Sequence, residues 1–199
     1  DQPPEFHPEG DVLTHTVGML NRLERRTPEL AMAVLLHDVG KPPTAVHDGQ
    51  RWRFNTHAEK GADMARDILR RLRFPHATID TVATVIRGHM RFQDAQKMRP
   101  STLRRWMGSE TFALEMELHR LDCLASHGDL RHYEFLRRAL AEYRSEPVLP
   151  EPWITGRDLL ALGVPPGPEL GRIKQEAYDA QLEGRFADRE KLLAWASTL

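Results

Sequence analysis

The stretch LAMAVLLHDVGKP, residues 30–42, decides the fold class and supplies the first hypothesis about function. Thr27 is a favoured N-cap residue and Pro28 suits the first helical position, so a helix is predicted to begin just before this stretch. Its apolar residues keep helical spacing up to the pair His37-Asp38. This pair therefore closes an apolar helix face, where an uncompensated polar group is costly.

Helical spacing of apolar residues continues through most of the chain, which predicts an all-α fold class. The one strand signal is Asp48-Gly49, which predicts a short hairpin within a loop over residues 41–55. Thr56 followed by Glu59 is read as a capping box. The expected helices are 12–26, 27–40, 56–73, one ending near 89, 109–128 and 130–144, with Asp11, Ser101 and Ser109 as further N-caps.

The composition changes at residues 145–152, where three prolines occur within six residues. Proline disfavours helix continuation, so a boundary is expected here. The prediction is a main helical domain over residues 1–147 and a small C-terminal helical appendage over residues 148–199, made of three short helices that pack on the main domain.

Composition excludes several classes of protein. The 199 residues contain one cysteine, so no internal disulfide is possible, and no apolar run is long enough for a signal sequence or a membrane span. A cytoplasmic protein without a membrane partner is expected. The net charge of -1 gives no general attraction to nucleic acid, so such contacts would come from local patches. Oligomeric state stays open.

His15 and Asp122 resemble the pair His37-Asp38, because each interrupts an apolar helix face. A lone histidine on such a face is more often a satisfied core residue, but four residues of this kind favour a metal site built from facing helices. Buried carboxylates need a cation or several donors. Mixed imidazole and carboxylate ligands suit Mn, Fe, Co, Ni or Zn, with Mg as an alternative.

The order His15, His37-Asp38 in LLHDVGKP, and then Asp122 resembles the H…HD…D signature of the HD-domain phosphohydrolase superfamily. The chain is also similar to the C-terminal half of bacterial tRNA nucleotidyltransferases, the CCA-adding enzymes. This likeness rests on FHPEGDVLTHT (6–16), NTHAEKGADMA (55–65) and ITGRDLLALGVPPGPELG (154–171). The resemblance implies an HD-domain helical bundle. The nucleotidyltransferase head of those enzymes has no counterpart in these residues, so CCA addition is not expected of them.

The resemblance implies that His15, His37, Asp38 and Asp122 bind a first divalent metal, and that Asp38 can bridge to a second. His57 and His89 match the positions that supply the second metal in dinuclear branches. Those branches often carry two adjacent histidines where this chain has Gly88-His89. One or two ions are therefore expected.

Asp38 and Lys41 are the predicted catalytic residues: Asp38 to hold the attacking water, and Lys41 to offer its ammonium group to a phosphate, although Lys41 could equally be a solvated loop residue. Arg91 follows His89 closely and is a second candidate phosphate contact. Trp52 and Phe54 could stack on a base, but packing is the more common role. The remaining histidines are read as surface or structural residues, with the first two held in reserve: His119, His127, His7, His47, His76 and His132.

The expected function is hydrolysis of nucleotide phosphoesters by a metal-activated water, most plausibly phosphodiesters such as 2′,3′-cyclic nucleotides. The partners would be a nucleotide or phosphodiester substrate and RNA 3′ ends. One alternative is an RNA- or tRNA-binding module of a nucleotidyltransferase with a vestigial metal site. Another is a regulatory HD nucleotidase or triphosphohydrolase. Turnover on cyclic diesters, monoesters and triphosphates would distinguish them.

Overall fold

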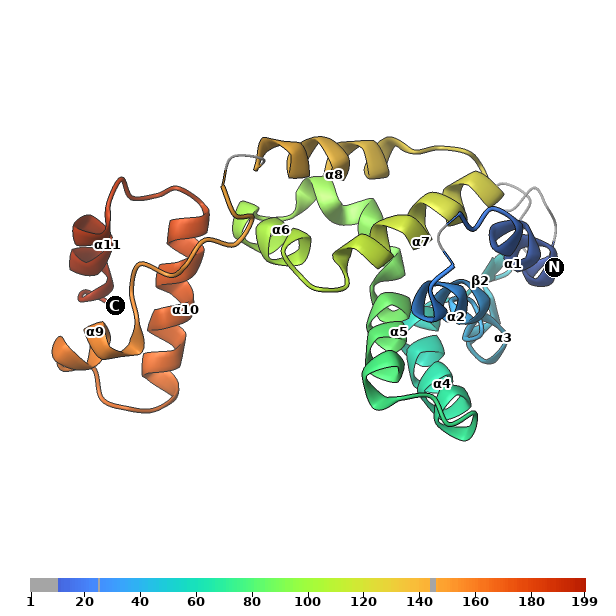
Figure 1. Ribbon diagram of the computed structural model, residues 1–199, viewed down its shortest axis with the longest axis horizontal. Coiled ribbons are helices and arrows are strands. Elements are labelled where there is room, and N and C mark those ends of the chain that lie inside the picture. Colours follow the sequence, from blue (N-terminus) through green and yellow to red (C-terminus); the bar gives the residue numbers. More distant parts are fainter. Residues whose placement is uncertain (1–10, 25, 144–145) are drawn as a thin grey trace. The chain divides into compact units, whose positions relative to one another are not determined.

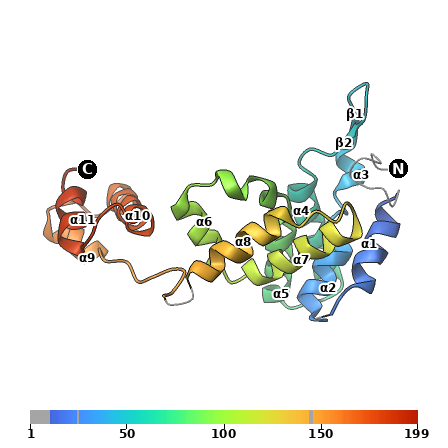
Figure 2. The same cartoon turned by 90° about the horizontal axis from the view of Figure 1, so that it is seen from above.

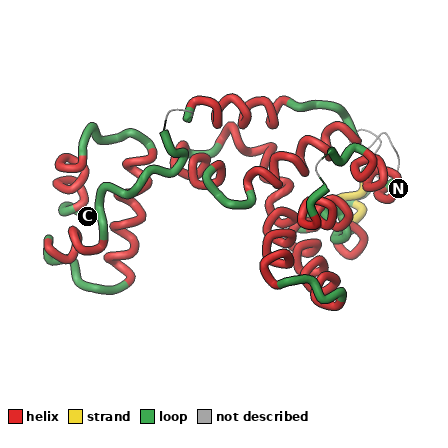
Figure 3. Tube along the Cα trace, in the orientation of Figure 1, coloured by secondary structure: helices red, strands yellow, loops and turns green. Residues whose placement is uncertain are grey.

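The computed structural model describes residues 11–24, 26–143 and 146–199, and helices account for most of them (Figure 3). The all-α prediction is therefore confirmed. The chain folds into two compact units. The first contains the chain up to Gln96 and Glu110–Arg137, and the second contains Lys97–Ser109 and Arg138–Leu199. The predicted boundary after residue 147 stays a prediction. Among the described residues, no helix is long and apolar enough to cross a membrane.

The first unit contains the predicted helices and the predicted hairpin (Figure 1). Its elements are α1 (Val12–Asn21), α2 (Pro28–Leu36), α3 (Lys41–Thr44), β1 (Val46–His47), β2 (Trp52–Arg53), α4 (His57–Arg71), α5 (His76–Gly88), the 3-10 helix η1 (His89–Lys97), which crosses into the second unit, and α7 (Phe112–Ala125). Helix α8 (Arg131–Glu142) also continues from the first unit into the second. Residue 144, the predicted end of this helix, lies outside the described residues.

Two of the predicted N-caps are confirmed. Asp11 Oδ1 accepts hydrogen bonds from the backbone of Leu13 and Thr14, and Thr27 Oγ1 accepts one from Leu30. Both helices end earlier than predicted, α1 at Asn21 and α2 at Leu36. The predictions for Ser101 and Ser109 were wrong, because α6 (Pro100–Met107) starts after Arg99 and α7 starts after Thr111.

The predicted capping box at Thr56 was also wrong. Thr56 is a left-handed residue with φ 65°, and its side chain makes no cap hydrogen bond. An N-cap side chain reaches the helix from an extended backbone, which this residue lacks. Left-handed geometry is costly for a β-branched residue, so the turn that delivers His57 to the start of α4 is strained.

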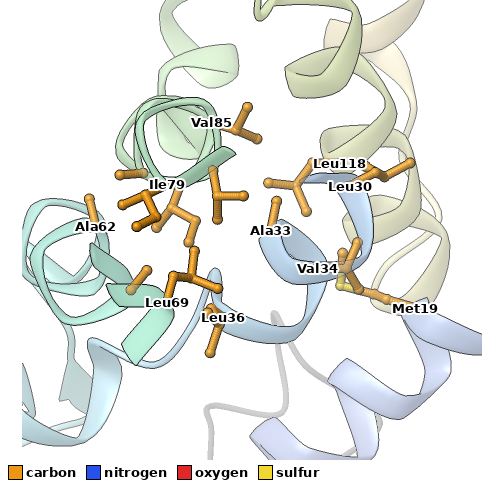
Figure 4. Packing of buried hydrophobic residues seen from close by; sticks show 14 of the residues in the cluster. Met19, Leu30, Ala33, Val34, Leu36, Ala62, Leu69, Ile79, Val85 and Leu118 are labelled. Carbon is orange, nitrogen blue, oxygen red and sulfur yellow. The ribbon is translucent and has the colours of Figure 1, made fainter. Parts of the chain in front are cut away.

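The core of the first unit lies between α1, α2, α4, α5 and α7 (Figure 4). Helix α4 buries small residues, Ala58, Gly61, Ala62 and Ala65, at helical spacing. This narrow face lets the turn after α2 come close, since a Cβ built on Gly40 would lie 2.2 Å from the His57 carbonyl oxygen and 2.6 Å from the Gly61 nitrogen. Glycine at position 40 is therefore what brings the His37-Asp38 turn against the start of α4.

The predicted hairpin is confirmed, with Val46 opposite Arg53 and His47 opposite Trp52 (Figure 2). All four strand residues are exposed, so no core stabilises the hairpin. Its turn is held by Asp48, whose Oδ1 accepts hydrogen bonds from the backbone of Gln50 and Arg51.

The second unit packs α9 (Gly156–Ala161), α10 (Pro168–Leu182) and α11 (Arg189–Ala196) around a core that includes Leu159, Ile173 and Leu192. These are the three tail helices expected from the sequence.

Arg99, which precedes α6, and the arginines of α6 have partners within this second unit. Arg105 Nε and one guanidinium nitrogen lie 3.0 and 2.7 Å from Asp179 Oδ1, and Arg99 lies 2.9 Å from Glu183. The buried Arg104 donates to the carbonyls of Pro147, Val148 and Leu182. These arginines therefore hold the unit together.

Candidate metal centre

Six side chains proposed as metal ligands come from separate elements of the first unit and are brought together at one place. His15 lies in the middle of α1, the pair His37-Asp38 in the turn after α2, His57 at the first residue of α4, His89 at the first residue of η1 directly after α5, and Asp122 in α7. The four histidines and Asp38 are buried, and the side chain of Asp122 is 27% exposed.

These side chains form two groups, each with potential ligand atoms within 4.8 Å of one another. The first group is His15, His37 and Asp122, in which His15 Nε2 lies 3.1 Å from Asp122 Oδ1. The second group is Asp38, His57 and His89. No other group of this kind is found in the described residues.

Asp38 belongs to the second group and also lies close to the first. Its Oδ2 is 3.3 Å from His37 Nε2, in the first group, and its Oδ1 is 3.7 Å from His57 Nε2, in the second. One carboxylate thus directs one oxygen towards each group, which is the arrangement that a bridging ligand needs.

Backbone carbonyls fix the orientation of three rings. The Nδ1 atoms of His37, His57 and His89 lie 2.9, 2.7 and 2.6 Å from the carbonyl oxygens of the residues three positions earlier. A carbonyl oxygen accepts only, so each Nδ1 carries the proton and each neutral ring keeps its lone pair on Nε2. Hydrogen bonds of this kind, from the ring nitrogen that does not bind the ion, orient metal-binding histidines.

The pair His57 and His89 shows how well these residues fit a metal. Their Nε2 atoms are 3.1 Å apart, and neither has a proton to share when both rings are neutral. Two nitrogens bound to one ion at about 2.1 Å and at right angles would be about 3.0 Å apart. The observed separation therefore suits a cation held between the two rings.

In the absence of a metal, electrostatics keep His57 and His89 neutral, as ligands must be, but keep His37 protonated, so an ion that binds there displaces a proton. Burial lowers the pKa of His89 to about 4 and also lowers the pKa of His57, so both rings are neutral. Burial opposes charge on His37 as well, but the carboxylates of Asp38 and Asp122 raise its pKa to about 9. Burial would raise the pKa of Asp38, yet His37 and Lys41 hold that pKa well below its usual range.

Lys41 is buried at the start of α3, with its Nζ 2.7 Å from Asp38 Oδ2 and 5.8 Å from the centre of the Phe54 ring. A role as a solvated loop lysine is therefore wrong. Arg91 lies elsewhere: one of its guanidinium nitrogens is 4.0 Å from Glu115 Oε2, and it does not line the pocket that contains Asp38. Its contact with a substrate stays a prediction.

Glu115 is a buried residue that sequence reasoning missed. It is 1% exposed, and its Oε1 accepts a hydrogen bond from Thr111 Oγ1 at 2.7 Å. A Cβ built on Gly88 would lie 2.7 Å from Glu115 Oε2. The carboxylate therefore occupies the space that a side chain at position 88 would need. This contact explains why the residue before His89 is a glycine. Gly88 departs from the paired-histidine pattern, and that departure was the signal of Glu115 available in the sequence.

The two groups open into a pocket of about 750 Å³. Its lining includes Asp38, Lys41, His57, His89 and Asp122, here called the floor, and residues of the hairpin and of the segment that follows α7, here called the walls. Pockets of this size hold nucleotide-sized ligands.

His119, which the sequence left as a weaker candidate for the site, lines the pocket and stacks on Phe92 with ring centres 4.0 Å apart. Burial lowers its pKa to about 4. His127 and His132 also line the pocket, whereas His76 is exposed at the start of α5. His7 lies outside the described residues.

Comparison with known proteins matches residues 12–129 to the HD domain family model. An A-adding tRNA nucleotidyltransferase from Deinococcus radiodurans is 31% identical over 93% of this chain and 46% of its own length. A CC-adding tRNA nucleotidyltransferase from Thermus thermophilus is 38% identical over 84% of this chain and 39% of its own. A multifunctional CCA protein from Halorhodospira halophila is 34% identical over 88% and 43%. The chain thus spans less than half the length of these relatives.

Proposed function

Because the chain belongs to the HD domain family of metal-dependent phosphohydrolases, we propose that it hydrolyses phosphoester bonds of nucleotides, and specifically the phosphodiester of a 2′,3′-cyclic nucleotide. The observation that carries this proposal is the position of Asp38, whose two oxygens face two separate groups of metal-binding side chains at 3.3 and 3.7 Å.

The proposed ligands of the first ion are His15, His37, Asp38 and Asp122. Asp38, His57 and His89 would hold the second. Imidazole nitrogens and carboxylate oxygens together favour Mn, Fe, Co, Ni or Zn, with Mg as an alternative. The facing Nε2 atoms of His57 and His89 support the second site, because two lone pairs at 3.1 Å repel each other unless a cation or a proton lies between them.

When bound, a divalent ion supplies Lewis acidity that lowers the pKa of water and neutralises charge on phosphate oxygens. Asp38 would orient the attacking water and accept its proton. Lys41, 2.7 Å from Asp38 Oδ2, keeps this carboxylate ionised and places an ammonium group at the pocket floor for a phosphate oxygen. Attack of water on phosphorus breaks one ester P–O bond, and the leaving oxygen takes a proton.

The test is hydrolysis of 2′,3′-cyclic AMP and bis(p-nitrophenyl) phosphate by chelator-treated protein refilled with Mn, Ni, Co, Zn or Mg. Turnover should depend on the metal and fall at least 100-fold in His37→Ala and Asp38→Ala. His76→Ala, a change at an exposed histidine outside the pocket, should keep wild-type turnover. Folded protein that is inactive with every metal would refute the proposal.

A second candidate is an RNA- or tRNA-binding module. It is favoured by the relatives, which are named as tRNA nucleotidyltransferases and of which this chain spans less than half. Tight tRNA binding without turnover on any phosphoester would support it. Nucleoside monophosphates and triphosphates belong in the same assay, because fastest turnover on either would instead indicate a nucleotidase or a triphosphohydrolase.

A further inference from the structure

The pocket wall contributed by the hairpin has a feature that neither a metal nor a scissile phosphate requires. Trp52 lines the pocket with 48% of its surface exposed, and Arg51 and Arg53 on either side of it line the pocket as well. The hairpin buries none of its four strand residues, so the core gives no reason for its presence. A two-stranded hairpin without core packing is marginally stable in water.

The hairpin is nevertheless held in a defined shape by its own polar contacts. The Asp48 backbone N–H donates to the Arg51 carbonyl at 3.1 Å, and the Asp48 carboxylate pairs with the Arg53 guanidinium. His47 packs edge-on against the Trp52 ring, with ring centres 5.2 Å apart. These contacts fix the turn and the indole ring, so Trp52 is presented at the pocket wall by a locally ordered element.

The residues that follow α7 add a further cation to the pocket lining. Arg131, at the first residue of α8, lines the pocket and lies 2.7 Å from Asp129, which lines it too. The other carboxylates of the lining, Asp38 and Asp122, belong to the proposed metal centre. Away from the floor the lining thus contains three arginines and one carboxylate. A guanidinium group has five N–H donors and can bind a carboxylate and a phosphate together.

The cations of the walls are additional to those expected at the floor. The scissile phosphate would be neutralised by the metal centre and by Lys41, so arginines on the two walls are suited to other phosphates. An exposed indole beside arginines is the combination with which proteins bind single-stranded nucleic acid, by base stacking and by contacts to the backbone.

We propose that the hairpin and the start of α8 form a subsite for the nucleotide that precedes the terminal one, which bears the scissile phosphate, with Trp52 stacking on the base of that preceding nucleotide and Arg51 and Arg131 contacting the phosphate that joins the two. The substrate class is then the 3′ end of a single-stranded RNA, and a mononucleotide is a poor substrate. The assignment of a 2′,3′-cyclic phosphate at the RNA 3′ end as the reacting group rests on the proposed function.

The test compares a trinucleotide that ends in a 2′,3′-cyclic phosphate, 2′,3′-cyclic AMP, and bis(p-nitrophenyl) phosphate, which has no base. For the metal-loaded protein, kcat/KM on the trinucleotide should exceed that on 2′,3′-cyclic AMP about 10-fold or more. Trp52→Ala and the double variant Arg51→Ala/Arg131→Ala should abolish this advantage and leave turnover of bis(p-nitrophenyl) phosphate unchanged. The matched control is Arg87→Ala, an exposed arginine of the same unit that pairs with Asp63 outside the pocket.

A binding measurement separates the two proposals. Chelator-treated protein is titrated with a fluorescent trinucleotide 3′-phosphate and with adenosine 3′-phosphate as competitor. Trp52→Ala should weaken trinucleotide binding about 5- to 100-fold, the range for one stacked base. Loss of both arginines should lower the slope of log K against log salt by about 0.7, since both contact the same phosphate and one neutralised single-strand phosphate contributes about 0.7.

The outcomes test the subsite proposal and the phosphodiesterase proposal separately. Equal kcat/KM for the trinucleotide and the mononucleotide would overturn the subsite and leave the phosphodiesterase proposal intact. Absence of turnover on all three substrates would refute the phosphodiesterase, and binding would then decide the subsite. Trinucleotide binding that depends on Trp52 would sustain it, and binding that the three substitutions leave unchanged would overturn it.

Discussion

His57 Nε2 and His89 Nε2 lie 3.1 Å apart, although each ring already donates its Nδ1 proton to a backbone carbonyl. Two lone pairs at this distance favour a shared cation. His57 begins α4 and His89 follows directly after α5, and these two helices pack side by side in the core, so the separation is set by the fold.

The first prediction concerns the number of metal ions. Wild-type protein reconstituted with Mn should contain two ions per chain by elemental analysis, and His89→Gln should contain one. The glutamine keeps the volume but replaces the Nε2 ligand. Saturating Mn should also raise the melting temperature less in the variant, since a ligand at 100 times its Kd contributes about 2.7 kcal/mol.

The control for metal content is His76→Gln, which changes an exposed histidine at the start of α5. Two ions per chain in His89→Gln would contradict the assignment of His89 as a ligand. One ion in the wild type would restrict the site to a mononuclear centre.

A second prediction follows from the contact of Gly40 with α4. Gly40→Ala should lower the free energy of unfolding by about 3 kcal/mol or more, because the new methyl group meets backbone atoms of His57 and Gly61 that cannot rotate away. Gly171→Ala is the matched control: it lies in α10 with nothing within 4 Å of the added Cβ, and should stabilise by about 0.5–1 kcal/mol. Urea denaturation in the presence of chelator measures both, and equal effects would contradict the prediction.

Gly88 and Glu115 give a third prediction, suited to a double-mutant cycle. Gly88→Ala should destabilise by about 1–3 kcal/mol, because its Cβ would lie 2.7 Å from Glu115 Oε2. Most of this penalty should disappear when Glu115→Ala is already present, since the space is then empty. Additive effects would show that the carboxylate does not determine glycine at this position.

The fourth prediction is a pH dependence. Burial lowers the pKa of His119 to about 4, so the folded state holds the neutral ring while the unfolded chain takes up a proton near pH 6.5. The stabilisation from this residue is complete above pH 6.5 and is lost as pH falls towards 4. Without metal, the free energy of unfolding should therefore decrease over this range.

The control is His119→Gln, whose slope below pH 6.5 should be shallower by up to about 1.4 kcal/mol per pH unit. His89 titrates in the same direction in both proteins, so the difference isolates His119. His76→Gln should leave the slope unchanged. An NMR titration of the His119 ring with a midpoint near 6.5 would contradict the prediction.

Sequence patterns predicted the helices well where apolar periodicity was strong, and less well where a side chain was expected to cap a helix. Asp11 and Thr27 cap as predicted, because an extended backbone precedes both helices. Ser101 and Thr56 do not, since neighbouring residues set the local backbone: Pro100 begins α6 one residue earlier, and Thr56 is left-handed. A cap motif encodes the side chain but not the backbone angle that it needs.

The proposed metal-binding residues could be found from the sequence because polar side chains on apolar helix faces are rare. The same reasoning did not identify Glu115, although its side chain is as deeply buried as that of His37. Its importance lies in a contact with Gly88 across 27 residues of chain, which periodicity cannot reveal. The partners of Arg99 and Arg105 were missed for the same reason, since they come from α10 and the residue after it.

The Phe54 carbonyl accepts hydrogen bonds from both the backbone N–H and the Nδ1 of His57, and Phe54 follows directly after β2. One peptide group thus ties the orientation of a proposed ligand to the hairpin. If the proposed RNA subsite and the proposed metal centre are coupled through this peptide group, thermodynamic linkage requires that RNA and metal tighten each other's binding by the same factor. Loss of the metal ion would then weaken RNA binding, and release of the RNA would weaken metal binding.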